Sequence, residues 1–354
     1  MERTDSMKRF INCAFKIIFS RTLFIILMIL VQLAVLCFGF TKLGESFSYI
    51  TEGMSLLGAL LVIFIVNRDG APEFKMTWCI LICLLPVFGA LIYLFVELNL
   101  GGIGLKARTY VRLKETEGLL FTTERTKKAV AGSQADFRGF ARYMEGTVGF
   151  PAYQGSEAVY YPSGEDKFKD LLKELQKAER FIFLEYFIME RGIMWNAILD
   201  ILKEKVKQGV EVRVMYDGMC SILLLPYGYP KELQKYGIKA KMFAPIRPFL
   251  STNQNNRDHR KIVVIDGKVA FTGGVNLADE YINEKEVYGH WKDTAVKITG
   301  EAVRSFTVMY LQMWHVSENG AADEYEKYLQ NIVFDKPLKD DGFVIPYGEM
   351  PTVS

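Results

Sequence analysis

The sequence predicts an α/β fold with a mixed, largely parallel sheet flanked by helices, preceded by N-terminal transmembrane helices. Half of the 354 residues are hydrophobic and 24% are charged, a more apolar balance than is usual for a soluble domain. The excess lies in about the first hundred residues, whereas the remainder alternates strand-like and helix-like patterns. A membrane anchor followed by a folded domain is therefore expected.

The anchor is expected to occupy residues 1–104. Its predicted spans are residues 22–41, 47–66 and 76–96. The first run has no charged residue between Arg21 and Lys42 and is long enough for a hydrocarbon core of about 30 Å. It is long for a signal peptide, and no small-residue cleavage site follows it, so we interpret it as a retained anchor.

The other two spans each contain one unfavourable residue. Glu52 lies near the start of the second span, where a carboxylate costs less than the roughly 2.5–3.5 kcal/mol expected at the bilayer centre. Pro86 lies inside the third, and proline is tolerated where neighbouring groups satisfy the freed backbone.

Basic residues before the first span favour a cytoplasmic N-terminus, whereas those from Lys106 to Lys114 favour a cytoplasmic domain. The sequence thus predicts a multi-pass protein of the cell membrane, with the side of the domain left open.

The folded domain is expected over residues 159–335, after a connector at 105–158. Ser163 precedes a helical apolar stripe and is predicted to cap that helix. The run Phe181–Met189 is typical of a buried strand, a second helical stripe follows, and Val210–Asp217 is a further strand. This strand–helix–strand order predicts a parallel pair.

Two further elements are expected to extend the sheet. They are a short helix over Pro230–Tyr236 and a strand over Ala240–Pro245. The stretch Ile246–Asp258 contains proline and several asparagines and is predicted to be a loop leading to the next strand. Functional residues often lie on such loops.

The segment HRKIVVID, which follows this loop, carries the candidate chemistry. Side chains alternate along a strand, so His259 and Lys261 are expected on one face, about 7 Å apart, with Arg260 on the other. An imidazole can attack phosphorus, and a fixed ammonium can stabilise charge on the phosphate oxygens. An ordinary strand with a basic start explains the spacing equally well.

The last residue of this segment and the residues that follow it suggest a turn and an anion site. Asp266 should point away from His259, and Asp-Gly is a strong hairpin signal, so a turn role is favoured over substrate contact. Gly273 and Gly274 would let backbone N–H groups approach an anion, and Asn276 could add a side-chain donor.

The stretch HRKIVVIDGKVAFTGGVN matches the H-x-K-x4-D-x6-G-[GS]-x-N signature of the phospholipase D superfamily, spacing included. FIFLEYFIM, VEVRVMYDG, GGVNLADEYIN and GHWKDTAVKITGEAV also resemble bacterial cardiolipin synthases. The resemblance extends over nearly the whole chain from about residue 50, and it implies one phospholipase D-type half domain.

In that family a histidine attacks one phosphatidylglycerol to form a phosphatidyl-histidine, glycerol leaves, and a second phosphatidylglycerol gives cardiolipin. The resemblance implies His259, Lys261 and Asp266 as the catalytic set, with His259 as nucleophile or its acid/base partner and Asp266 in a supporting role. It implies a phosphate subsite of Lys261, Gly273, Gly274 and Asn276. It implies no metal and no organic cofactor. The implied partners are the membrane and anionic phospholipid.

The chain departs from the family's pattern because it contains one motif where a full enzyme has two. His290 copies the start of the motif, but Lys297 falls at the position of the aspartate, and His315 has no lysine partner. Both are interpreted as structural. Residues 336–354 resemble the start of a linker to a second half. A homodimer or a separately encoded half would then supply the second motif.

Two other functions fit the same sequence. One is a catalytically inactive protein, truncated or lipid-binding. The other is a single-motif phosphodiesterase acting on nucleic acid, which the dispersed basic residues and the net charge of +2 disfavour, so no nucleic-acid partner is expected. Water as acceptor would make the protein a phospholipase, and a second lipid would make it a synthase.

Overall fold

The computed structural model describes most of the chain. The described residues are 45–68, 70–97, 100–220, 224–245, 257–316, 325–330, 332–334 and 342–350, with Leu30, Ala34 and Glu318. They form two compact units, divided between Ile103 and Gly104. The span expected at 22–41 lies outside the described residues, apart from Leu30 and Ala34, as does most of the loop expected at Ile246–Asp258.

The described residues of the first unit between positions 45 and 97 form three helices packed against one another. They are α3 (Glu45–Asn67), α4 (Pro72–Leu84) and α5 (Pro86–Glu97). Ile65, Ile82 and Tyr93 form its small core. The rings of Trp78 and Tyr93 meet edge to face, with centroids 5.4 Å apart, and join α4 to α5.

The single helix expected over 76–96 is instead divided at Leu85. Leu85 has φ −134° and ψ 74°, and Pro86 starts the next helix, because proline disfavours a helical conformation in the residue before it. A Cβ on Gly89 would lie 2.7 Å from the Cα atom of Ile82, so glycine permits the sharp fold between α4 and α5. Within the described part of the chain, no helix is both long enough and apolar enough to cross a membrane. The membrane placement of this unit stays a prediction.

The second unit is built on a seven-stranded sheet. Its strands are β1 (Ser156–Tyr161), β2 (Phe181–Tyr186), β3 (Glu211–Asp217), β4 (Lys239–Phe243), β5 (Ile262–Ile265), β6 (Val269–Gly273) and β7 (Ala295–Gly300). Their order across the sheet is β1-β7-β6-β5-β2-β3-β4. The pairs β2–β3 and β3–β4 are parallel, as expected for β2 and β3, whereas the other four pairs of described strands are antiparallel.

The sheet is therefore mixed, as expected, but the expectation of a largely parallel sheet was wrong. The Asp-Gly turn accounts for one antiparallel pair, because it reverses the chain between β5 and β6. The pairs β2–β5, β6–β7 and β1–β7 are antiparallel through longer connections.

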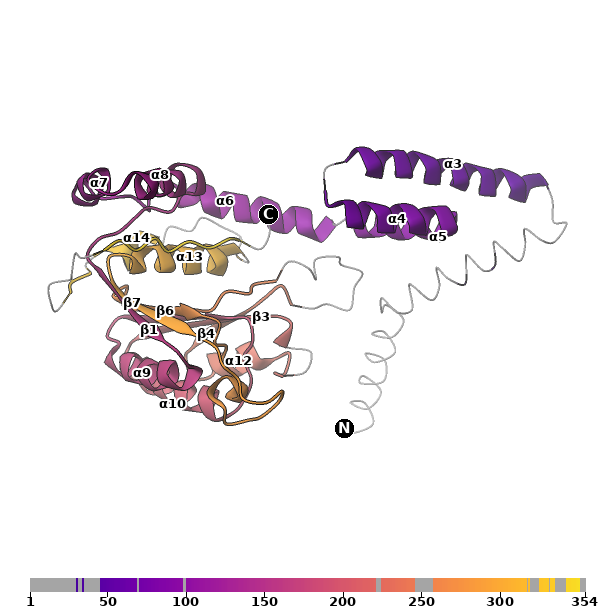
Figure 1. Cartoon of the computed structure of the whole chain (residues 1–354). Helices are drawn as coiled ribbons and strands as arrows, with labels where there is room; N and C mark the ends of the chain where they lie inside the picture. Colours follow the sequence, from indigo (N-terminus) through magenta and orange to yellow (C-terminus); the bar gives the residue numbers. More distant parts are fainter. Residues whose placement is uncertain are drawn as a thin grey trace, which may run out of the picture. The chain divides into compact units, whose positions relative to one another are not determined.

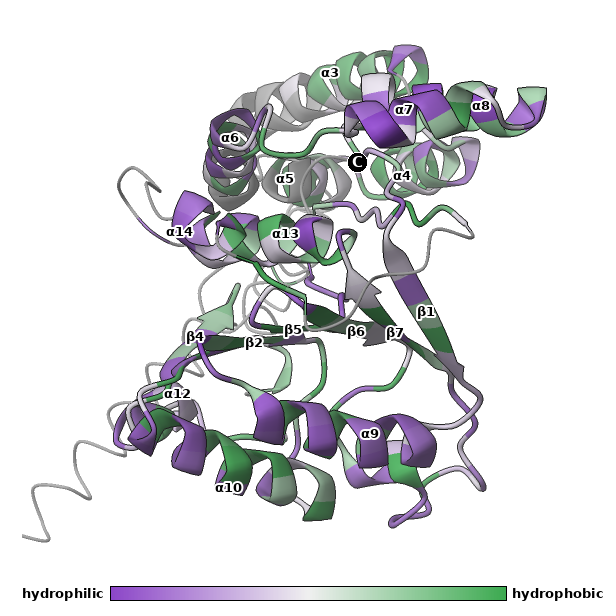
Figure 2. Cartoon of the chain, turned by 90° about the vertical axis from the view of Figure 1, so that its left-hand side faces the viewer, coloured by the Kyte–Doolittle hydropathy of each residue, from purple (hydrophilic) through white to green (hydrophobic). Residues whose placement is uncertain are grey.

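Helices cover both faces of this sheet (Figure 1). On one face lie α9 (Gly164–Lys177), α10 (Ile193–Lys207) and α12 (Tyr229–Gln234), and on the other α13 (Val303–Val316) and α14 (Tyr325–Leu329). Every residue of β2 is buried, as expected for a strand covered on both sides. The outer sides of α9 and α10 are mainly hydrophilic (Figure 2).

Local sequence signals account for several element boundaries. The hydroxyl of Ser163 accepts a hydrogen bond from the backbone N–H of Asp166, 3.2 Å away, and caps α9 as expected. The stripe of α10 buries Trp195, Ile198 and Leu202. These helices fix the position of β2 and β3, whose carboxyl ends reach the candidate site.

The connector contains more regular structure than expected. It holds α6 (Leu100–Glu115), α7 (Glu124–Ala131), α8 (Ala135–Tyr143) and a single π-helical turn (Met144–Val148). The segment 342–350 returns to this region, where Val344 pairs with Tyr153 and Phe343 stacks on Phe137 at 4.8 Å.

Candidate active site

His259 lies in the extended segment that leads into β5, at the edge of the second unit. Its side chain is exposed, and its ring packs at 4.6 Å against the ring of Phe187, which directly follows β2. Partial burial and then the charge of Lys261 lower the pKa of His259, although Asp258 and Asp217 oppose this effect. The imidazole is therefore held largely neutral near neutral pH, the form that can attack an electrophile.

Lys261 lies beside His259, as the alternation along the strand predicts. Its side chain is only 6% exposed, and its Nζ atom donates to the backbone oxygen of His259 at 2.7 Å and sits 5.3 Å from the centre of the Phe187 ring. Burial lowers the pKa of Lys261 to about 8, against the attraction of Asp258 and Asp293. No described carboxylate forms an ion pair with this ammonium.

A buried carboxylate at the end of β3 holds the backbone of this segment. Asp217 is fully buried and accepts hydrogen bonds from the N–H of Asp258 at 2.9 Å and from the guanidinium of Arg257 at 3.2 Å. Burial raises the pKa of Asp217. Asp217 thus fixes the residues immediately before His259. The sequence analysis did not assign Asp217 to the site, and no local pattern indicates a contact between residues 41 positions apart.

Arg260 and Glu185 form an ion pair on the opposite face of the sheet from Lys261. Glu185, fully buried in β2, accepts from Arg260 Nε at 2.7 Å and Nη2 at 2.6 Å. Burial raises the pKa of Glu185 well above its ordinary value, the charge of Arg260 opposes this effect, and the nearby Asp258 adds to it.

Asp266 lies at the far end of β5, in the turn to β6. Its carboxylate accepts hydrogen bonds from three successive backbone N–H groups, those of Glu179 at 2.8 Å, Arg180 at 2.7 Å and Phe181 at 2.8 Å. Asp266 therefore fastens the hairpin to the start of β2. These contacts lie at the end of β5 opposite His259 and agree with the expected turn role. The place of Asp266 in the catalytic set stays a prediction.

The two glycines of the motif pack tightly against the segment before β7. A Cβ on Gly273 would lie 2.4 Å from the carbonyl oxygen of Thr294, and one on Gly274 would lie 2.0 Å from the carboxylate of Asp293. The N–H of Gly274 already donates to Thr294 at 3.0 Å. Close packing therefore explains both glycines, and their contact with a phosphate stays a prediction.

Asn276 is also engaged within the protein. Its Oδ1 atom accepts from the N–H of Ile188 at 3.0 Å, and its Nδ2 atom donates to the hydroxyl of Tyr281 at 2.8 Å. An amide nitrogen carries two hydrogens, so one N–H can still donate to a ligand. The phosphate role of Asn276 stays a prediction on that basis.

Lys261 lines a small cavity that the sequence did not predict. The other lining residues are Lys167, Tyr186, Phe271, Thr272, Gly273, Val275 and Ala295. Lys167 from α9 is the residue that sequence reasoning missed, since a lysine near the start of a helix is ordinarily taken to be exposed.

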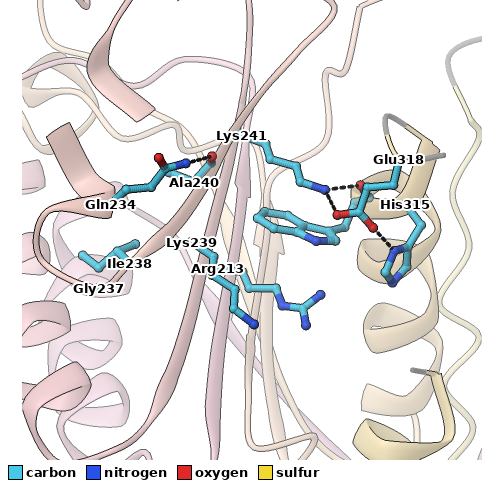
Figure 3. A pocket seen from close by; sticks show the side chains of 10 residues that line it. Arg213, Gln234, Gly237, Ile238, Lys239, Ala240, Lys241, His315 and Glu318 are labelled. Atoms are coloured by element: carbon cyan, nitrogen blue, oxygen red, sulfur yellow. Dashed lines mark hydrogen bonds and ion pairs between the residues drawn. The ribbon is translucent and has the colours of Figure 1, made fainter. Parts of the chain in front are cut away.

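The other two histidines are not among the described contacts of His259 or Lys261. His290 is exposed, and buried His315 bonds through Nδ1 to Glu318. His315 and Glu318 line a wider cleft of about 560 Å³ beside β4 (Figure 3). The residues lining this cleft include neither His259 nor Lys261, and its cations Lys239 and Lys241 already bind carboxylates.

Comparison with known proteins gives a consistent assignment. Residues 171–314 match the family described as cardiolipin synthase, PLD-like domain, and residues 56–97 match the phospholipase D-nuclease N-terminal family. A cardiolipin synthase of Alkalihalophilus pseudofirmus is 34% identical over 74% of this chain and 52% of its own length. One of Geobacillus kaustophilus is 33% identical over 74% of this chain and 52% of its own. The chain thus spans about half the length of these relatives.

Two further similarities complete the comparison. An uncharacterized protein of Streptococcus mutans is 44% identical over 82% of this chain and 62% of its own. Among solved structures, NucT from Helicobacter pylori aligns with a TM-score of 0.37 and 16% identity, covering 46% of this chain and 97% of NucT. The family is assigned from the sequence matches alone. The chain belongs to the phospholipase D superfamily and contains the phospholipase D-like domain of the cardiolipin synthase family.

Proposed function

We propose that this chain provides a phosphatidyltransferase site of the cardiolipin synthase type, anchored in the membrane by its N-terminal segments. The observation that carries the proposal is the pairing of an exposed, largely neutral His259 with a buried Lys261 that has no described carboxylate partner. A nucleophile beside an uncompensated cation suits attack on an anionic phosphodiester.

In the first step, a nitrogen of His259 forms a bond to the phosphorus of one phosphatidylglycerol. The bond from phosphorus to the glycerol oxygen breaks, and that oxygen takes up a proton as glycerol leaves. Lys261 offsets the charge on the phosphate oxygens. Asp217 contributes by holding the backbone before His259, so that the imidazole keeps its position.

In the second step, a hydroxyl of another phosphatidylglycerol attacks the phosphatidyl-histidine. The P–N bond breaks, the hydroxyl proton is released to a base, and cardiolipin is formed. Both steps need an acid/base group besides the nucleophile. No other described histidine contacts His259, so we infer that a second copy of this chain, or a separate second half, supplies that group.

The test is turnover by the full chain in vesicles that contain labelled phosphatidylglycerol. We expect equal amounts of cardiolipin and glycerol from the unaltered chain and none from the His259→Ala variant. Glycerol without cardiolipin would indicate water as the acceptor and would replace the synthase by a phospholipase. If neither product exceeds the His259→Ala control, the chain is not self-sufficient, and the same assay with an added second half tests the remaining proposal.

A further inference from the structure

Lys167 is a buried lysine in the first part of α9, and its side chain is 2% exposed. It occupies a position of the buried stripe of this helix, because Leu171 and Leu175 follow on the same face. Its Nζ atom lies 2.9 Å from the hydroxyl oxygen of Tyr186, at the end of β2. No described carboxylate lies within ion-pair distance of it.

Lys167 shares its surroundings with the motif lysine. Lys167, Tyr186 and Lys261 line the same small cavity, together with Gly273 of the motif's glycine pair. The cavity has no room for a water molecule, so Lys167 lies beneath the site rather than in contact with a ligand. Asp293, before β7, is the acidic group that attracts both ammonium groups.

Two buried amines without an ion pair are unfavourable in the free protein. Removing an ammonium group from water destabilises its charged form unless an anion is close. Burial accordingly lowers the pKa of Lys167 to about 7 and that of Lys261 to about 8. A methionine or leucine would complete the apolar stripe of α9 equally well, so packing alone does not explain a lysine at this position.

We propose that Lys167 is a positioning residue that supplies a second positive charge to the phosphate site from within the same half domain, acting through Tyr186. When Lys167 is ionised it donates to the Tyr186 oxygen, and this contact holds its positive charge beneath the place beside Lys261 where the phosphate would bind. This inference rests on the proposed function, because it assumes that the phosphate binds beside Lys261.

The test measures proton uptake when the full chain binds sulfate, a tetrahedral dianion that does not titrate near neutral pH. Calorimetric titrations in two buffers of different ionisation enthalpy, at pH 8, give the number of protons bound. At that pH, the lowered pKa values leave a large share of both lysines neutral in the free protein, and more of Lys167 than of Lys261. Sulfate is therefore expected to bind with uptake of protons by both lysines, with the larger share at Lys167.

The Lys167→Met variant keeps the packing and removes the charge. We expect its proton uptake to fall by more than half and its sulfate affinity at pH 7 to fall roughly tenfold. Tyr186→Phe removes a single oxygen and should weaken sulfate binding in the same direction, which keeps the test valid if the methionine variant folds poorly. Lys169→Met, an exposed lysine on the same helix, is the matched control and should match the unaltered chain.

The outcomes separate the inference from the proposed function. If Lys167→Met and Tyr186→Phe bind sulfate with the affinity and proton uptake of the unaltered chain, Lys167 has no part in the site, while the site itself stands. If the unaltered chain binds no sulfate, or if binding survives in Lys261→Met, the phosphate site at Lys261 is wrong and the inference is overturned with it.

Discussion

Replacing Asp266 by alanine tests whether the motif's aspartate supports the fold or takes part in the chemistry. Its carboxylate accepts three backbone N–H bonds of 2.7–2.8 Å, and hydrogen bonds to a charged group contribute about 1.5–3 kcal/mol each. Because two of the three donors are only partly buried, water can replace part of the loss. We therefore expect Asp266→Ala to lower the free energy of unfolding by about 3–5 kcal/mol.

The assay is thermal unfolding of the purified full chain, followed by the activity of the molecules that remain folded. For a unit of this size the loss corresponds to a fall in Tm of roughly 6–20 °C. Asp266→Asn keeps the oxygen that faces Arg180 and Phe181 and should lose about half as much stability. A variant with unchanged Tm but no turnover would refute the supporting role and return Asp266 to the catalytic set.

Three further predictions follow from the same geometry. Arg260→Met leaves the buried carboxyl of Glu185 without its cation and should destabilise the protein by about 3–5 kcal/mol, measured by urea unfolding; a loss below about 1 kcal/mol would contradict the ion pair's importance. Lys261→Met removes a charge that lowers the pKa of His259, so the midpoint of the imidazole in an NMR titration should move to higher pH, and an unchanged midpoint would contradict this coupling. Gly274→Ala places a methyl group where a carboxylate now lies and should reduce the yield of folded protein, whereas a yield and Tm equal to the unaltered chain would refute the tight packing.

Local patterns in the sequence were enough to predict much of the second unit. Ser163 caps its helix, β2 and β3 pair in parallel, and the Asp-Gly turn joins β5 to β6. Each of these depends on residues close together in the chain, where side-chain periodicity and turn chemistry decide the outcome.

Contacts between distant segments were harder to predict. The bond from Asp217 to the N–H of Asp258 joins residues 41 positions apart, and Lys167 meets Tyr186 only because α9 packs on β2. Neither contact has a periodic signature. The break at Leu85 was also missed, although Pro86 is visible in the sequence. A proline can either kink a helix or end it, and which of the two occurs here depends on how α4 and α5 pack.

The most direct test of the central claim is to trap the covalent intermediate. The full chain is mixed with phosphatidylglycerol labelled in the phosphatidyl group and stopped in alkaline detergent, in which a phosphorus–nitrogen bond survives, and its peptides are examined by mass spectrometry. The account predicts a phosphatidyl adduct on His259, absent from His259→Ala and unaffected in Lys169→Met. An adduct on another residue, or turnover that persists in the His259→Ala variant, would contradict it.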